Sequence, residues 1–314
     1  MMALAPANPF CTARYAEAME AHGSQRWLLR TEHDGRLKSG CYAFLDAGRI
    51  NRVLQIVSVP EVPPDDFFWE GLLGFCLANR ITCLDINSFS SSAARIPRLG
   101  AEMSRQDRCE YVLDLEDPNW EKKLALKHRQ NIKKARLAGV NVKMSTTAEA
   151  CRDHVRLMGA TLDRRRRRGE SVPGNIDKEW SWCMRLVQSG AGKVFQADAG
   201  GESLSSALIM TAPRGAYTQS AGTSAQGMRC GASHFLIHSI GRALHSESIR
   251  WFNLGGAERN PGLALFKSRF GATRVPLQSA TFYLGGRARR TLGEAAHYIR
   301  RAVSALAHRH GNAS

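Results

Sequence analysis

The chain has 314 residues, 43% of them hydrophobic, which is enough for one large or two ordinary packed domains. No run of about 18 apolar residues suggests a membrane span, and the N-terminus lacks the basic start and apolar core of a signal peptide. The eight cysteines show neither a C-x-x-C pair nor zinc spacing, so we expect reduced thiols, a cytoplasmic location and no metal site.

The net charge of +16 is distributed unevenly. Residues 1–110 carry 12 basic and 13 acidic side chains, whereas residues 111–314 carry 32 basic and 15 acidic ones. A positive field attracts polyanions and raises their encounter rate. Nucleic acid, a phosphorylated cofactor and an anionic membrane surface are therefore candidate partners of the second part, against the alternative of a surface that only aids solubility.

The first 111 residues predict a small mixed unit of helices and strands. The expected elements are a helix at 12–22, strands at 27–32, 40–45 and 50–59, a helix at 66–79, and strands at 81–86 and 109–115. A tight turn at Asp34-Gly35 joins the first two strands. The unit has about the modal size of a domain.

The second part begins at Asp117-Pro118, a strong helix start. The expected elements are a helix from 118 to 138, a strand at 140–145, helices at 148–168 and 176–188, strands at 193–199, 204–212 and 216–223, a loop at 225–232, and a helix at 233–246. Short turns join the three central strands, which predicts an antiparallel meander.

Three features of this part are candidates for anion binding. The first helix carries Lys127 and Lys134 on its polar face, and the second ends in five arginines, Arg164 to Arg168. The loop at 225–232 combines two glycines with Arg229 before a helix N-terminus, a pattern that can hold phosphate. Each feature also has an ordinary explanation, either a solvated helix face or a simple turn.

The most informative stretch runs from 250 to 272. It predicts a buried strand that ends on Gly255-Gly256, followed by a helix start at Asn260-Pro261. Lys267 then follows Phe266 close to the strand end, where an ammonium can stabilise negative charge that develops on a substrate. The alternative is a solvated surface lysine.

These stretches resemble the FemAB-like branch of the GCN5-related N-acetyltransferase superfamily. The matching segments are K-H-R-Q-N-I-K-K-A-R-L-A-G-V (127–140), F-N-L-G-G (252–256) and P-G-L-A-L-F-K-S-R-F-G-A (261–272). The resemblance covers 112–285 well and 1–111 by outline. It implies an α/β (α+β) fold of tandem acetyltransferase-like domains, each a mixed, mostly antiparallel sheet flanked by helices.

We expect a degenerate acetyltransferase-like domain at 1–111 and a basic, catalytic one at 112–286. A basic amphipathic helix is expected at 287–314, which either extends the anion-binding surface or packs on the domain. The oligomeric state is not predicted.

The resemblance implies a transferase that forms an amide between an activated acyl group and an amine. In Fem enzymes the donor is an aminoacyl ester on tRNA, and Phe266 and Lys267 match the Phe and Lys at the acceptor end of that tRNA. We therefore expect Lys267 and Phe266 to be catalytic. The expected donor-binding residues are Lys127, Arg129, Lys134, Arg165, Arg166, Arg229 and Arg269. The expected substrate pocket contains Tyr217, Gln219, Asn253, Gly255 and Gly256.

No Ser-His-Asp or Cys-His motif is apparent, so direct aminolysis is favoured over a covalent intermediate. We expect no bound cofactor, aminoacyl-tRNA as co-substrate, and a small-molecule or peptide amine as acceptor. The segment 226–232 departs from the acetyl-CoA pattern Q-x-x-G-x-G, which weakens coenzyme A as donor. The alternatives are acyl transfer from acyl-CoA or acyl carrier protein, and a non-enzymatic nucleic-acid-binding protein on a decayed transferase fold.

Overall fold

The computed structural model describes residues 7–48, 51–60, 66–91, 95–170, 176–257 and 260–285. Groups of strands are interspersed with helices along the chain after a 3-10 turn at Pro9–Cys11. The strands are β1 (Gln25–His33), β2 (Arg36–Ala47), β3 (Arg52–Ile56), β4 (Cys83–Asn87), β5 (Ala101–Asp114), β6 (Asn141–Ser145), β7 (Gly192–Ala199), β8 (Glu202–Thr211), β9 (Gly215–Thr223), β10 (Trp251–Gly256) and β11 (Thr273–Tyr283). The helices are α1 (Ala13–Glu20), α2 (Asp66–Ala78), α3 (Leu126–Leu137), α4 (Ala148–Arg167), α5 (Ile176–Gln188), α6 (Ala225–Cys230), α7 (Ala232–Ser246) and α8 (Pro261–Ser268).

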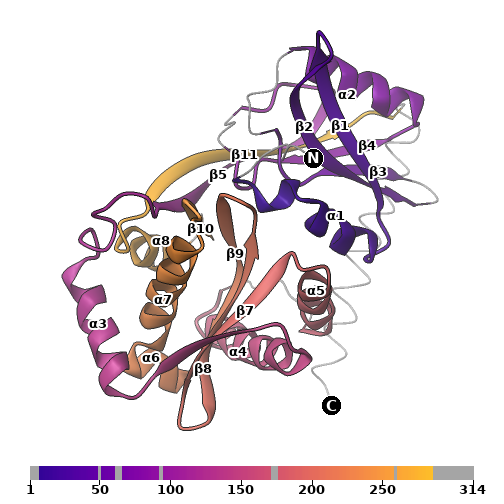
Figure 1. Cartoon of the computed structure of the whole chain (residues 1–314). Coiled ribbons are helices and arrows are strands. Elements are labelled where there is room, and N and C mark those ends of the chain that lie inside the picture. Colours follow the sequence, from indigo (N-terminus) through magenta and orange to yellow (C-terminus); the bar gives the residue numbers. More distant parts are fainter. Residues whose placement is uncertain are drawn as a thin grey trace, which may run out of the picture.

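The described strands form one sheet in the order β1-β2-β3-β4-β11-β5-β10-β9-β8-β7-β6. Neighbouring strands are antiparallel, except that β3 pairs with β4 and β9 pairs with β10 in parallel. The helices lie against this sheet in both halves of the molecule (Figure 1). The expected fold class, a mixed and mostly antiparallel sheet flanked by helices, is therefore confirmed.

Strands β5 and β11 join the two halves of the sheet. They pair antiparallel along all of β11, from Thr273 opposite Val112 to Tyr283 opposite Ala101. β11 also pairs with β4 of the first half, and β5 pairs with β10 of the second half. Figure 1 shows β11 as a long curved strand that runs from one half to the other. The predicted boundary between 111 and 112 falls within β5 and stays a prediction.

Burial of apolar side chains gives each half its own core. In the first half, α2 packs on β2 to β4, and Phe282 of β11 is part of that cluster. In the second half, α3 and α7 pack on the sheet around Phe252. A third cluster joins the N-terminal segment to the second half, where the ring centroid of Phe10 lies 4.8 Å from that of Tyr217. Residues near the N-terminus therefore support β9.

Two of the elements expected in the second half differ from the sequence prediction. The helix expected from 118 begins only at Leu126, because Asp117 closes a turn by accepting from the Asn119 N–H at 2.8 Å and pairing with Lys123 at 2.5 Å. The loop expected at 225–232 contains α6, which ends at Gly231 in the left-handed conformation (φ 82°). Both differences arise from local side-chain and backbone hydrogen bonds.

The basic helix expected at 287–314 lies outside the described residues. Within the part of the chain that the structure describes, no helix combines the length and the apolarity needed to cross a membrane.

Candidate active site

The site forms where β9 and β10 separate. The two strands pair only from Trp251 to Asn253 of β10. Beyond this point β9 contains an extra residue, Gln219, opposite β8, and β10 gains one residue relative to β5 between Asn253 and Gly256. Such β-bulges bend a strand and interrupt its pairing. The bulges on both strands therefore keep the pair open at one end.

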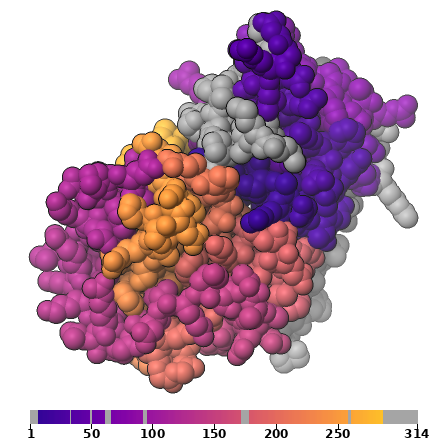
Figure 2. All heavy atoms as spheres, viewed as in Figure 1, coloured from indigo at the N-terminus to yellow at the C-terminus, as the bar shows by residue number. Residues whose placement is uncertain are grey.

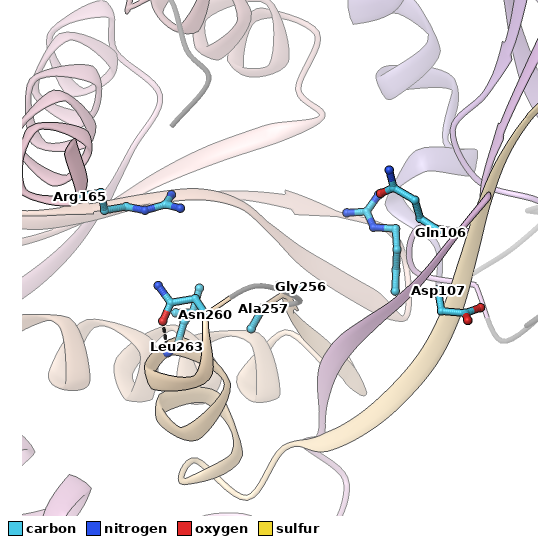
Figure 3. A pocket seen from close by; sticks show the side chains of 8 residues that line it. Gln106, Asp107, Arg165, Gly256, Ala257, Asn260 and Leu263 are labelled. Atoms are coloured by element: carbon cyan, nitrogen blue, oxygen red, sulfur yellow. Dashed lines mark hydrogen bonds between the residues drawn. The ribbon is translucent and has the colours of Figure 1, made fainter. Parts of the chain in front are cut away.

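A cavity of about 740 Å³ occupies this opening. β9 and β10 form one side of it, and residues from the C-terminal end of α4, from α7 and from α8 form the others. A second cavity of about 560 Å³ shares Arg165, Gly256, Asn260 and Leu263 with the first and extends to β5. Figure 3 shows Arg165 reaching into this second cavity, with Gln106 of β5 on the opposite side. The two cavities form one connected cleft.

Lys267 supplies the ammonium that lines the larger cavity. Its side chain is only 8% exposed, and Nζ donates to the Gly256 carbonyl at 2.7 Å. α8 holds it there because Asn260 caps the helix by accepting from the Leu263 N–H at 2.9 Å, with Pro261 at the first helical position. The structure thus places Lys267 in the wall of the cleft. The alternative, a lysine solvated on the protein surface, is excluded by this burial.

Glycine is required beside this ammonium. Gly255 has φ +76°, a conformation that other residues rarely adopt. A Cβ at this position would lie 3.6 Å from Lys267 Nζ and 3.7 Å from the Tyr217 hydroxyl oxygen. The left-handed residue lets β10 turn under the lysine and leaves the two polar groups close together.

A buried carboxyl ties the site to the first half of the chain. Glu110 of β5 is 2% exposed and accepts three hydrogen bonds, from the Tyr217 hydroxyl (3.0 Å), Asn253 Nδ2 (2.6 Å) and the Ser90 N–H (3.0 Å). Asn253 Oδ1 in turn accepts from the Gly255 N–H at 2.8 Å. Burial raises the pKa of Glu110, while the hydrogen bonds from Asn253, Ser90 and Tyr217 lower it in part. Glu110 therefore holds β9 and β10 at their last paired residues, Tyr217 and Asn253.

Phe266 is held by an aromatic cluster. Its ring centroid lies 5.3 Å from that of His128, 5.0 Å from that of His234 and 5.1 Å from that of Phe270. His128 Nε2 also donates to the Phe266 carbonyl at 2.9 Å. Burial lowers the pKa of His128 and, more strongly, that of His234, to about 4, so both rings are neutral at pH 7. The two histidines act here as packing groups.

Half of the site residues predicted from the sequence lie in this cleft. The larger cavity is lined by seven of them, namely Arg165, Tyr217, Gln219, Gly255, Gly256, Phe266 and Lys267. Asn253 is buried behind the cavity wall and acts through Glu110 and Gly255. The other candidates are exposed and do not line either cavity: Lys127, Arg129 and Lys134 on α3, Arg166 on α4, Arg229 on α6, and Arg269 after α8. Their role in donor binding stays a prediction.

Two buried groups escaped sequence reasoning, Glu110 and His154. His154 of α4 is 1% exposed, and its Nδ1 and Nε2 form hydrogen bonds with Ser206 Oγ and Ser220 Oγ, each at 2.8 Å. Ser220 lines the cavity. Burial lowers the pKa of His154 to about 4, and its second nitrogen meets a hydroxyl rather than a carboxylate. The arrangement therefore lacks the group that stabilises an imidazolium in a catalytic triad.

The arginine run contributes two residues to the cleft that were not expected there. Arg164 and Arg168 line the larger cavity together with Arg165. Glu170 pairs with Arg165 at 2.8 Å and with Arg168 at 2.7 Å, which holds both guanidinium groups in place. Within the described residues, no group of three or more His, Cys, Asp and Glu side chains is arranged to hold a metal ion.

Residues 122–267 match the family described as acetyltransferase (GNAT) domain. This segment is a GNAT domain. It contains β6 to β10, α3 to α7 and α8 as far as Lys267, and so most of the cleft. The GNAT domain makes the chain an acyltransferase, as the sequence resemblance implied.

Solved structures of similar fold cover nearly the whole chain. FemX has a TM-score of 0.67 at 12% identity, over 92% of this chain and 94% of FemX. L-PGS from Bacillus licheniformis has a TM-score of 0.53 at 12% identity, over 90% and 95%. A tandem GNAT protein from the clavulanic acid biosynthesis pathway has a TM-score of 0.51 at 14% identity, over 84% of each chain. The fold is thus FemAB-like and GCN5-related. No curated protein sequence matches the chain.

Proposed function

We propose that the protein moves an aminoacyl group from aminoacyl-tRNA to the amine of a small-molecule or peptide acceptor by direct aminolysis. The observation that carries the proposal is the buried ammonium of Lys267, held by the Gly256 carbonyl in the wall of the cleft. A cation in a site from which water is largely excluded stabilises an oxyanion far more strongly than a cation exposed to solvent does.

In this reaction the acceptor amine attacks the ester carbonyl of the donor. The carbonyl oxygen becomes an oxyanion, which the Lys267 ammonium stabilises by about 3 kcal/mol. The intermediate then expels the alcohol of the donor, which leaves with the proton that the amine gives up. Holding amine and ester in line can supply a further 7–11 kcal/mol, roughly. Direct transfer suits this cleft, because the buried, neutral His154 is a poor base for activating Ser220.

The distribution of cations supports a polyanionic donor. Arg164, Arg165 and Arg168 line the cleft itself, while Lys127 and Lys134 lie exposed on α3. Figure 2 shows the exposed face of α6 to α8, in orange, beside the magenta segment that contains α3. A donor that reaches from α3 into the cleft would meet positive charge along its path.

The structure of segment 225–231 favours tRNA over coenzyme A. A loop that cradles a pyrophosphate presents open backbone N–H groups. Here α6 occupies the segment, and a Cβ at Gly227 would lie 2.3 Å from the Leu204 carbonyl oxygen. Gly227 therefore serves the packing of α6 on β8, which leaves less backbone for phosphate.

The test is transfer from tRNA charged with radiolabelled amino acids to a panel of amines, with and without ribonuclease, beside parallel reactions with acyl-CoA and acyl carrier protein. We expect transfer that ribonuclease abolishes. Transfer from acyl-CoA or the carrier protein alone would assign the alternative donors. Tight tRNA binding without any transfer would instead favour the non-enzymatic alternative.

The same assay tests Lys267. Lys267→Met keeps the aliphatic stem and removes the charge, so we expect turnover to fall about 100- to 1000-fold with the melting temperature nearly unchanged. Lys38→Met, at an exposed position on β2, is the matched control and should keep full turnover. Equal turnover of Lys267→Met and wild type would remove Lys267 from the mechanism.

A further inference from the structure

One face of α8 continues from the catalytic lysine into an apolar wall. Leu263, Phe266 and Lys267 follow the spacing i, i+3, i+4, which places them on one side of a helix, and all three line the larger cavity. Leu265 is 49% exposed on the same helix but does not line the cavity. The cavity therefore meets a defined stripe of α8.

Neighbouring elements extend this wall. Leu236 and Ile237 of α7 and Leu254 of β10 are buried residues that line the cavity. Met228 and Leu263 line it as well, although they are 54% and 39% exposed. Large apolar side chains left partly open in a concave site are typical of a surface that an apolar ligand group covers. We call this set the apolar wall: Met228, Leu236, Ile237, Leu254, Leu263 and Phe266.

The charged side chains of the same cavity come from elsewhere. Except for Lys267, they all belong to the end of α4 and the residues that follow it: Arg164, Arg165, Arg168 and Glu170. A phosphate or a charged side chain has partners on that side. Against the apolar wall it would be desolvated without compensation. The cavity thus separates a place for charge from a place for a hydrocarbon group.

Distance along α8 relates the apolar wall to the reacting bond. Leu263 precedes Lys267 by four residues, which corresponds to a rise of about 6 Å. The side chain of an acyl group begins one carbon away from its carbonyl. A carbonyl at the Lys267 ammonium therefore brings that side chain within reach of Leu263 and Phe266.

We infer that the apolar wall binds the side chain of the acyl group being transferred, and that the protein selects aminoacyl donors with a large aliphatic or aromatic side chain. This inference rests on the proposed function. It predicts that the protein binds leucyl donors more tightly than glycyl, aspartyl or lysyl donors. An apolar portion of the acceptor is the competing occupant.

Binding is tested with non-hydrolysable analogues, 3′-aminoacylamino-3′-deoxyadenosines that carry leucyl, glycyl, aspartyl or lysyl groups, by calorimetry on the full chain. We expect the leucyl compound to bind at least about tenfold more tightly than the other three. Leu263→Glu should remove this preference. Leu265→Glu, a matched change on the opposite face of α8, should retain it; both positions are partly exposed, so both variants are expected to fold.

Transfer assays with leucyl-, glycyl-, aspartyl- and lysyl-tRNA separate this inference from the proposed function. Transfer from all four at similar rates, or a preference for lysyl-tRNA, would overturn the apolar selection while leaving tRNA-dependent transfer in place. Selectivity that follows the apolar character of the acceptor instead of the donor would also overturn it. Absence of transfer from every aminoacyl-tRNA would count against the proposed function, and the analogue series then still decides what the apolar wall binds.

Discussion

At the residue scale, Glu110 is an ionisable carboxyl group buried inside the protein. A carboxyl that is 2% exposed loses its hydration, and three donors from Ser90, Tyr217 and Asn253 replace the lost water contacts. Tyr217 and Asn253 lie where β9 and β10 begin to separate. Glu110 is therefore a positioning residue that sets the shape of the cleft through its hydrogen-bond partners.

Glu110→Gln is predicted to destabilise the fold by about 1–3 kcal/mol at or below pH 4.5. The substitution replaces one carboxyl oxygen by an NH₂ group, whose N–H donors then face a group that donates to Glu110 in the wild type. Burial raises the pKa of Glu110 in the folded state above its ordinary value of 4.5. Its contribution to stability is then fully present below that ordinary value and is lost as pH rises through the folded pKa. The destabilisation caused by the substitution should therefore shrink with rising pH.

Urea unfolding at a series of pH values measures this difference. Glu202→Gln, at an exposed position on β8, is the control and should follow the wild-type pH dependence. If Glu110→Gln also follows wild type across the series, Glu110 does not titrate with a raised pKa in the folded protein.

Sequence reasoning could find Lys267 and Phe266 because their chemistry is local. A lysine beside an aromatic residue, after a glycine-marked strand end, is visible in a few consecutive residues. Glu110 and His154 carried no such signal, since each depends on partners far away in the chain, such as Asn253 for Glu110 and Ser220 for His154. Long-range satisfaction of a buried polar group is not encoded in any short pattern.

At the element scale, the link from β10 to α8 depends on one left-handed residue. Gly255→Ala adds a Cβ at φ +76°, which costs about 1–2 kcal/mol of stability. The new methyl group would also lie 3.3 Å from the Thr218 carbonyl oxygen, a tight contact that the backbone has to relieve, whereas 3.6 Å to Lys267 Nζ is an ordinary contact. The backbone shift reaches the neighbouring Gly256 carbonyl, which accepts from Lys267 Nζ, and so displaces the ammonium. We expect turnover to fall by about 100-fold, the effect of a misplacement of about 1 Å.

Gly200→Ala separates strain from displacement. Gly200 has φ +59°, and nothing lies within 4 Å of a Cβ at that position. In thermal unfolding the Gly200→Ala variant should lose about as much stability as Gly255→Ala, but it should keep wild-type turnover. A comparable loss of turnover in both variants would mean that global stability, and not the position of Lys267, limits the reaction.

Helices and strands were predicted correctly where the hydrophobic periodicity and the turn residues indicate the same element. The prediction failed where a strand forms only by pairing with a segment far away in the sequence. The antiparallel meander of β7, β8 and β9 follows from its apolar strands and glycine turns and is confirmed. The first half of β5, from Ala101 to Arg108, is polar and was not expected as a strand. It pairs with residues of β11 that lie from 169 (Arg108 to Leu277) to 182 (Ala101 to Tyr283) positions away in sequence. Cross-strand partners of this kind override local propensity.

At the scale of the whole molecule, the β5–β11 pair makes one sheet out of two halves that differ in charge. The first 110 residues are close to neutral, and the excess of basic residues lies in the remainder, which includes the GNAT domain. Composition alone revealed this asymmetry, but the arrangement of the halves depended on contacts such as β4 with β11. The cleft therefore lies mainly in the basic second half, and it reaches the near-neutral first part of the chain only at Gln106, Asp107 and Arg108 of β5.

That asymmetry predicts how tRNA binding responds to salt. The logarithm of affinity should fall linearly with the logarithm of salt concentration, with a slope of about −0.9 for each phosphate neutralised. Lys127 and Lys134 are exposed on α3, so replacing both with alanine should reduce the magnitude of the slope by about 2. Fluorescence anisotropy with labelled tRNA over a salt series measures it.

The control removes the same charge from the other half. Arg36 and Lys38 are exposed on β2, and their double replacement with alanine lowers the net charge equally. Because a surface charge beyond a Debye length of about 10 Å from the bound phosphates is screened, this variant should keep the wild-type slope. An equal change of slope in both variants would show that overall charge, and not the surface of α3, governs the association, and the donor path from α3 into the cleft would have to be abandoned.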